Sequence, residues 1–123
     1  MKQKTAVSSE QLAIAAVEGI RDKKGLEIVT MDLRNVKGAI TDFFVIASGT
    51  SDRHVQALAD SVEKYIRENL NDKPMSREGM QRGEWVLLDY VNVVVHLFQN
   101  DRRQFYDIES LWGDAEIKEW PDK

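Results

Sequence analysis

The sequence predicts an α/β fold of the mixed α+β kind, with one mixed β-sheet flanked by helices. Two long segments carry apolar residues at helical spacing, whereas four shorter segments are rich in β-branched and aliphatic residues. The length of 123 residues suits one domain, and 42% hydrophobic residues supply one continuous core. Because no repeat, low-complexity segment or linker interrupts the chain, residues 1–123 are expected to form a single domain.

The first part of the chain carries one helix signal and two strand signals. Ser8 and Gln11 match a capping box, and the apolar residues that follow predict a helix over residues 9–24. Residues 26–33 are too short for a second helix and predict a strand. Residues 43–47 are apolar without alternation, which is typical of a central strand buried on both faces.

The middle of the chain predicts a long helix followed by a hairpin. Apolar residues from Val55 recur at i, i+3, i+4, i+7 and i+11, which predicts a helix over residues 51–70. Residues 75–83 show no clear period and suit a short edge strand with a loop. Residues 84–89 and 92–99 predict two strands, and the short connection between them makes the pair antiparallel.

The remaining segments predict short or irregular structure. Asn100 or Asp101 can cap one short helical turn, and Asp107 can cap a second that ends near Trp112. Residues 1–8 and 114–123 are polar or charged, so we expect two flexible tails.

Composition excludes several classes of function. The chain has no cysteine, which rules out disulfide scaffolds, thiolate metal sites and cysteine nucleophiles. A net charge of -4 and a pI near 5.2 argue against non-specific binding to nucleic acid but allow binding to a basic protein. No apolar run suits a signal peptide or a membrane span, so we expect a soluble, cytoplasmic protein.

The turn before the long helix is the most suggestive local motif. Gly49, Thr50 and Ser51 follow a strand and precede a helix, where free N–H groups can bind an anion. A phosphate-binding loop would need a longer glycine-rich span and a lysine, so a sharp turn at Gly49 with positive φ and a hydroxyl cap is favoured. Ser51 and His54 lie too close in sequence to build a catalytic triad.

No other pattern indicates catalysis or a bound metal. His54 and His96 are isolated from each other, and no Asp-x-Asp pair follows a strand. A partly buried structural role is favoured for His96, which lies among valines. We therefore predict no catalytic residue, no cofactor and no metal, and favour an interaction module over an enzyme.

The last third of the chain concentrates aromatic residues. Proteins often dock through such residues, although a tryptophan on a strand is also often part of a core. The aromatic residues are Trp85, Tyr90, Phe98, Phe105, Tyr106 and Trp112. Asp89, at the tip of the predicted hairpin, is a candidate for an exposed acidic contact.

Several motifs in the same order resemble the ribosomal silencing factor family, also called Iojap-like. They are DFFVIASGTS at 42–51, RHV at 53–55, EWVLLDY at 84–90, VVHLF at 94–98 and YDIESLW at 106–112. The resemblance covers about residues 10–115 and implies a nucleotidyltransferase-like fold without catalytic residues. It also implies a translational repressor that binds large-subunit ribosomal protein fourteen and blocks subunit joining when nutrients are scarce.

This resemblance directs attention to six docking candidates. Trp85, Asp89 and Tyr90 come first, with Asp89 pairing with a lysine or arginine of the partner. The second rank is Asn92, His96 and Phe98, which strand alternation places on one face. Family members often carry Gly-Asp where this chain has Val91 and Asn92, so a charged contact at position 92 is in question.

Two further expectations follow. The resemblance suggests a homodimer in isolation, and an exposed aromatic surface would explain pairing that competes with ribosome binding. The alternative function is a nucleotide-binding or nucleotidyl-transferring enzyme that uses the turn at Gly49 to Asp52.

Overall fold

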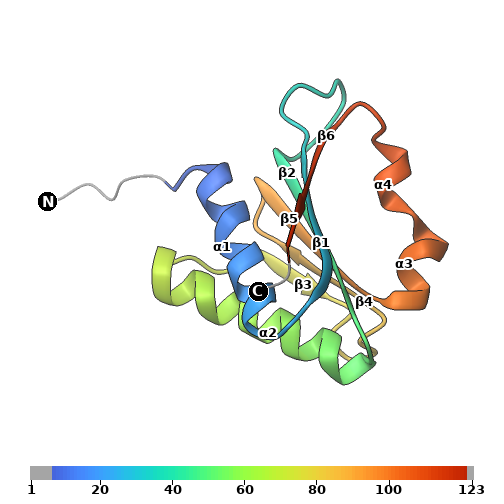
Figure 1. Ribbon diagram of the computed structural model, residues 1–123. Coiled ribbons are helices and arrows are strands. Elements are labelled where there is room, and N and C mark those ends of the chain that lie inside the picture. The colour runs from blue at the N-terminus through green and yellow to red at the C-terminus, as the bar shows by residue number, and fades with distance from the viewer. Residues whose placement is uncertain (1–6, 122–123) are drawn as a thin grey trace, which may run out of the picture.

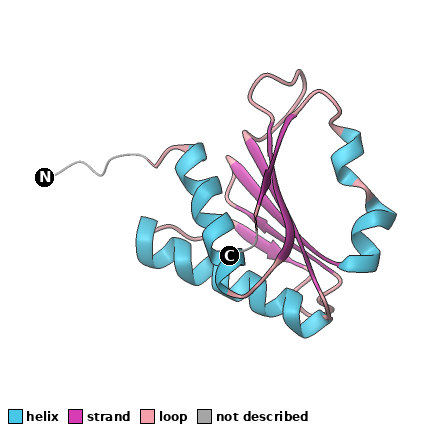
Figure 2. Ribbon diagram, viewed as in Figure 1, coloured by secondary structure: helices cyan, strands magenta, loops and turns pink. Residues whose placement is uncertain are grey.

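The sheet has six strands and separates two pairs of helices (Figures 1 and 2). The computed structural model describes residues 7–121. In chain order the elements are α1 (Ser9–Asp22), β1 (Leu26–Asp32), β2 (Phe43–Gly49), α2 (Asp52–Leu70), β3 (Ser76–Glu78), β4 (Trp85–Asp89), β5 (Val93–Gln99), α3 (Asn100–Tyr106), α4 (Ile108–Leu111) and β6 (Glu116–Trp120). The mixed α/β fold and the predicted order of helices and strands up to α4 are therefore confirmed.

The strand order is β3-β4-β5-β2-β1-β6. Among the strands of residues 7–121, only β2 and β5 pair in parallel, and the other neighbours are antiparallel. The apolar segment from 43 onward is thus a central strand, as predicted, and β4 and β5 form the predicted hairpin. The short strand β3 lies at one edge of the sheet.

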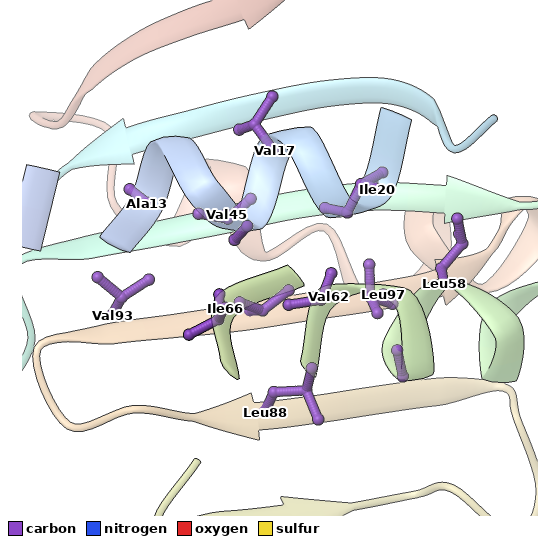
Figure 3. Close-up of a cluster of buried hydrophobic side chains, with 14 of the residues drawn as sticks. Ala13, Val17, Ile20, Val45, Leu58, Val62, Ile66, Leu88, Val93 and Leu97 are labelled. Carbon is purple, nitrogen blue, oxygen red and sulfur yellow. The ribbon is translucent and has the colours of Figure 1, made fainter. Parts of the chain in front are cut away.

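The first face of the sheet is covered by α1 and α2 (Figure 1). Alternate residues of the strands point into this layer, where aliphatic side chains from both helices meet them (Figure 3). The two helices pack closely because Gly19 has no side chain: a Cβ there would lie 2.8 Å from Val62 Cα. Ser61 Oγ also donates to the Gly19 carbonyl at 2.7 Å. This layer is the main core of the domain.

The opposite face is covered by the short helices α3 and α4 (Figure 1). One buried residue, Arg103, fixes these helices to the sheet. Its guanidinium donates to the Glu27 carbonyl at 2.6 Å and to Ser48 Oγ at 2.9 Å. It also forms an ion pair with Glu109 of α4 at 3.1 Å. Ile108 of α4 also packs against Met31 and Phe98 of the sheet, so a polar contact and apolar packing together hold the short helices on this face.

Helix capping follows the sequence closely. Ser8 accepts from the Gln11 N–H, and the Gln11 side chain accepts from the Ser8 N–H, which completes the predicted capping box. Ser51 caps α2 by accepting from the His54 N–H at 3.1 Å. None of the helices formed by the described residues is long and apolar enough to cross a membrane.

Two expectations need correction. Most of the predicted tail at 114–123 is ordered, because Glu116–Trp120 form β6 beside β1 and Trp120 packs against the main core. The expected N-terminal tail falls largely on residues 1–6, which lie outside the described residues, as do 122–123. Gly49 does not have positive φ. Its constraint is space, since a Cβ there would lie 2.9 Å from Val55 Cγ2.

Candidate functional site

Aromatic rings gather on the face of the sheet that α3 and α4 cover. We call Phe44, Trp85, His96, Phe98, Tyr106 and Trp112 the aromatic cluster. Trp85 lies at its centre, stacked on Phe98 with ring centroids 5.1 Å apart and 4.5 Å from the Tyr106 centroid. The β4–β5 register explains this arrangement, because Trp85 is directly opposite Phe98.

The members of this cluster differ in exposure. Phe98 is fully buried and His96 is 5% exposed, whereas Trp85 and Trp112 are half-buried and Tyr106 is 40% exposed. His96 and Phe98 therefore share one face, as alternation predicted, but they lie beneath the surface. His96 and Phe98 pack beneath the Trp85 ring. Of these three docking candidates in the cluster, Trp85 is the one that a partner can reach.

His96 has the buried structural place that its sequence environment predicted. Its Nδ1 accepts a hydrogen bond from Trp85 Nε1 at 3.2 Å, which leaves the proton of a neutral ring on Nε2. That Nε2 is buried and has no hydrogen-bond partner among the described residues. Burial lowers the pKa of His96 to about 4, so the ring is neutral at physiological pH.

The other docking candidates lie at the turn of the β4–β5 hairpin. Asp89 is half-buried and Asn92 is exposed. Tyr90, by contrast, is 6% exposed and packs in the main core on the first face, where burial raises the pKa of its hydroxyl. The structure therefore brings Asp89 and Asn92 to the surface together and directs the Tyr90 ring away from them.

The hairpin turn itself is strained. Val91 has φ of 75°, a region that β-branched residues rarely adopt. The Asn92 N–H donates to the Tyr90 carbonyl at 2.9 Å across a three-residue γ-turn. Asp89 Oδ1 accepts from the Val91 N–H at 2.7 Å. One oxygen of the Asp89 carboxylate thus stabilises the turn, a role that the sequence analysis did not foresee.

Exposed apolar residues surround this turn. We call Ile40, Met75, Asp89, Val91 and Asn92 the hairpin rim. Ile40 is 94% exposed, Met75 75% and Val91 50%. Three separate connections bring them together: the loop before β2, the loop after α2 and the hairpin turn.

Hydrogen bonds hold the connections of the hairpin rim in place. Thr41 Oγ1 donates to the Val91 carbonyl at 3.0 Å, and the Met75 N–H donates to the Asp89 carbonyl at 2.7 Å. Sequence analysis missed Ile40 and Met75, because an isolated apolar residue in a loop carries no periodic signal. The available signal was only that each is an apolar residue inside a polar segment.

Two side chains of the short helices extend the apolar surface beside the aromatic cluster. Phe105 is 75% exposed and its ring lies against Tyr106 in an edge-on arrangement. Leu111 of α4 is 71% exposed. Apolar side chains that gather into one exposed patch often mark an interaction site, so this face is the candidate docking surface.

The polar groups around the turn at Gly49 form hydrogen bonds within the protein. The Thr50 N–H donates to His54 Nδ1 at 2.9 Å, and His54 Nε2 lies 2.9 Å from the Lys23 carbonyl. Both ring nitrogens of His54 are therefore engaged away from Ser51, whose Oγ caps α2. The arrangement is a structural link between α1 and α2. Among the described residues, no group of three or more histidine or acidic side chains could hold a metal ion.

Comparison with known proteins supplies a family. The family model "Ribosomal silencing factor during starvation" matches residues 6–123. A ribosomal silencing factor of Halalkalibacterium halodurans is 38% identical over 110 residues, covering 89% of this chain and 92% of that protein. A crystal structure of a Chromobacterium violaceum protein superposes with a TM-score of 0.82 at 36% identity, covering 87% of this chain and 88% of the other.

A more distant relative is named for a ribosomal role in another setting. The mouse protein "Mitochondrial assembly of ribosomal large subunit protein 1" is 35% identical over 74 residues. The match covers 58% of this chain and 32% of the mouse protein.

Proposed function

Because the chain belongs to the ribosomal silencing factor family, we propose that it binds the large ribosomal subunit through ribosomal protein fourteen and blocks joining of the small subunit. In this role it lowers translation when nutrients are limited. The structural observation that carries the proposal is the half-buried Trp85, held by a buried histidine and phenylalanine on an incompletely covered sheet face. Such a rigid aromatic is a typical centre for a protein interface.

The docking surface consists of the exposed part of the aromatic cluster together with the hairpin rim. Trp85 and Asp89 lie on the same face of β4, four residues apart, which is about 13 Å along a strand. Trp85 supplies buried apolar area, and Asp89 supplies a carboxylate for a lysine or arginine of a basic ribosomal protein. The net charge of -4 favours the same partner. Asn92 adds a neutral polar contact beside Asp89.

Tyr90, His96 and Phe98 act from beneath this surface. Tyr90 anchors the hairpin in the main core, and His96 and Phe98 fix the orientation of Trp85. A docking role for these three residues is therefore positional: they hold the contacting side chains and do not themselves meet the partner.

The proposal also includes where the protein acts, how it acts and its oligomeric state. The protein acts in the cytoplasm by steric occlusion, not as an enzyme. No observation favours the nucleotide-binding alternative, since the polar groups of the Gly49 turn bond to one another and to α1. The free protein is proposed to be a homodimer, and light scattering at increasing concentration tests this directly.

Co-sedimentation with purified large subunits tests the docking surface. Asp89→Lys removes the carboxylate and adds repulsion, so the affinity should fall at least about tenfold. Asp60→Lys is the matched control, because Asp60 is exposed on α2, which covers the first face and not the docking surface, and the change in net charge is the same. If both variants bind alike, the docking surface lies elsewhere.

A second substitution separates the two roles of Asp89. Asp89→Asn keeps an oxygen that can accept the Val91 N–H but removes the charge. If Asp89 pairs with a cation of the partner, this variant also binds weakly while it folds normally. Subunit joining, followed on sucrose gradients, should recover in proportion to the binding that each variant loses.

A further inference from the structure

A groove of about 620 Å³ lies between α1 and β6 on the first face of the sheet. Phe43 and Thr30 line it as buried residues of the sheet, and Ile14 of α1 lines it with 42% of its surface exposed. Ligand pockets in proteins typically have volumes of about 300–1,000 Å³ and combine apolar side chains with a few polar groups. The groove therefore has the size and the lining of a binding site.

The two ends of the groove differ. At one end, Arg21 Nε of α1 donates to the Pro121 carbonyl at 3.1 Å, which joins the helix to the residue that follows β6. At the same end, the Trp120 indole donates to Thr30 Oγ1 at 3.1 Å. Among residues 7–121, no hydrogen bond or ion pair joins α1 to the first residues of β6, so the other end of the groove is open.

The open end carries carboxylates that no cation neutralises. Arg34 is committed to Asp32, with Nη2 2.7 Å from Oδ2 and Nε 3.0 Å from Oδ1. Glu10 lies near the Arg34 guanidinium, and Glu116 lies opposite Asp32 on the neighbouring strand. Both glutamates are exposed, and among residues 7–121 neither forms an ion pair. Two free carboxylates therefore flank the pair of Asp32 and Arg34.

The second cation that lines the groove is held by an aromatic ring. Lys118 Nζ lies 4.2 Å from the centroid of the Trp120 ring, whose electrons attract the ammonium group. Because Trp120 lies at the closed end, this attraction draws the lysine charge away from the open end. The open end is thus net negative, and such a surface favours a cationic ligand.

We propose that this groove binds a basic, partly apolar peptide segment of another protein. Lysine or arginine side chains of the segment pair with Glu10 and Glu116, and an apolar side chain packs on Ile14. The two glutamates come from different elements, so a ligand that meets both needs more than one cation, and Ile14 favours an apolar group beside them. A short basic peptide supplies all of these, and charge-assisted pairing with carboxylates favours it over a neutral or acidic one.

The groove is separate from the proposed docking surface. The strands β1, β2 and β5 lie between β6 and β4, and β4 carries Trp85 and Asp89. The inference therefore does not depend on ribosome binding, and a peptide in the groove leaves Trp85 free to meet the large subunit.

Fluorescence anisotropy with a short labelled peptide of alternating lysine and leucine tests the proposal. The peptide should bind the parent, and the affinity should fall as salt is added. Glu10→Lys and Glu116→Lys should each weaken binding about tenfold or more, because each replaces an attraction by a repulsion. Glu68→Lys is the matched control: Glu68 is exposed on α2 and does not line the groove, and the change in net charge is the same. Urea denaturation checks that each variant is folded.

Two further arms separate a built groove from simple attraction between opposite charges. Ile14→Ser leaves the charge of the protein unchanged, and a lysine–serine peptide keeps the charge of the ligand, so each should weaken binding severalfold if the apolar contact is made. Absence of binding to the parent, equal binding of the lysine–serine peptide, or equal losses from Glu116→Lys and Glu68→Lys would each overturn the proposal. Large-subunit binding of Glu116→Lys should match that of the parent, and its loss would overturn the separation of the groove from the docking surface.

Discussion

The two faces of the sheet are built in different ways. On the first face, α1 and α2 are 14 and 19 residues long and close the layer with aliphatic side chains and a glycine crossing. On the opposite face, α3 and α4 have 7 and 4 residues and leave Phe105 and Leu111 largely exposed. The first face is closed mainly by aliphatic side chains, whereas the second combines a smaller apolar cluster around Ile108 with Arg103 and stacked rings.

Because of this difference, we expect the first face to contribute more to the stability of the fold and the opposite face to contribute more to partner binding. Burial of aliphatic side chains stabilises a fold without directional demands, at roughly 25 cal/mol per Å² of apolar area. A face that retains half-buried aromatics gains less from folding and can gain more from a partner. The predictions below test this division, because each change should affect one face and spare the other.

The largest effect is expected at the crossing of α1 and α2. Gly19→Val would place side-chain atoms against the backbone of Val62 and Ser61, where even a Cβ lies 2.8 Å and 3.1 Å from existing atoms. We expect a loss of about 3 kcal/mol in the free energy of unfolding, measured by urea denaturation. Gly113→Val is the control, since no atom lies within 4 Å of a Cβ at that position. Equal midpoints for the two variants would contradict the close crossing.

On the opposite face, Arg103→Leu should release the short helices. The substitution leaves the Glu27 carbonyl and Ser48 Oγ without their donor and breaks the pair with Glu109. We expect a loss of about 2–3 kcal/mol, with faster amide hydrogen exchange in α3 and α4 than in α1 and α2. Arg102→Leu is the control, because Arg102 is only half-buried and its nearest contact with Glu84 is 3.7 Å long. Uniform exchange across both helix pairs would show that Arg103 does not hold α3 and α4 selectively.

His96 should make the aromatic face sensitive to acid. Burial lowers the pKa of His96 from 6.5 to about 4 in the folded protein, so the unfolded chain binds the proton first as the pH falls. Stability from the neutral ring is therefore complete above pH 6.5 and is lost between pH 6.5 and 4, by about 3 kcal/mol.

Comparison with His96→Gln isolates this contribution from that of other titrating groups. Glutamine can still accept from Trp85 Nε1 but does not titrate in this range. Urea denaturation at several pH values should show a smaller loss of stability in the variant than in the parent. Parallel pH profiles would mean that His96 is not desolvated in solution.

The sequence predicted the first face better than the second. The apolar spacing in α1 and α2 repeats over several turns, and such repetition specifies both the helix and its buried side. The strand β6 was missed because it alternates charged residues with Ile117 and buries little besides Trp120. Its pairing with β1 joins segments some ninety residues apart, as in the contact between Trp120 and Thr30, and local patterns carry no such information.

The sequence singled out residues of the candidate site, but it did not show how deeply each of them is buried. Trp85 and Asp89 were selected from the sequence, and the structure leaves both half-buried. The residues of β5 are apolar on both faces, so nothing in their pattern distinguishes Phe98 at 0% exposure from a surface aromatic. The hairpin rim also depends on three connections that meet only in the folded chain. Whether these residues contact the ribosome stays a prediction.

The smallest change in the free energy of unfolding is expected at the hairpin turn. Here the substitution should stabilise the protein, whereas the earlier substitutions destabilise it. Val91 has φ of 75°, which costs a β-branched residue roughly 1–3 kcal/mol, and glycine adopts this conformation freely. Val91→Gly also increases the freedom of the unfolded chain, which offsets part of the gain. We therefore expect a net stabilisation of about 1 kcal/mol by urea denaturation.

Val91→Ala is the matched control for this prediction. It removes most of the side chain but keeps a Cβ at positive φ, so it should recover less stability than glycine. Both substitutions also delete an exposed apolar side chain from the hairpin rim. If Val91→Gly raises stability while both variants bind the large subunit more weakly, the strained valine serves docking and not folding. If glycine destabilises the protein, the turn is not strained by valine, and the division between a face that stabilises and a face that binds does not extend to this hairpin.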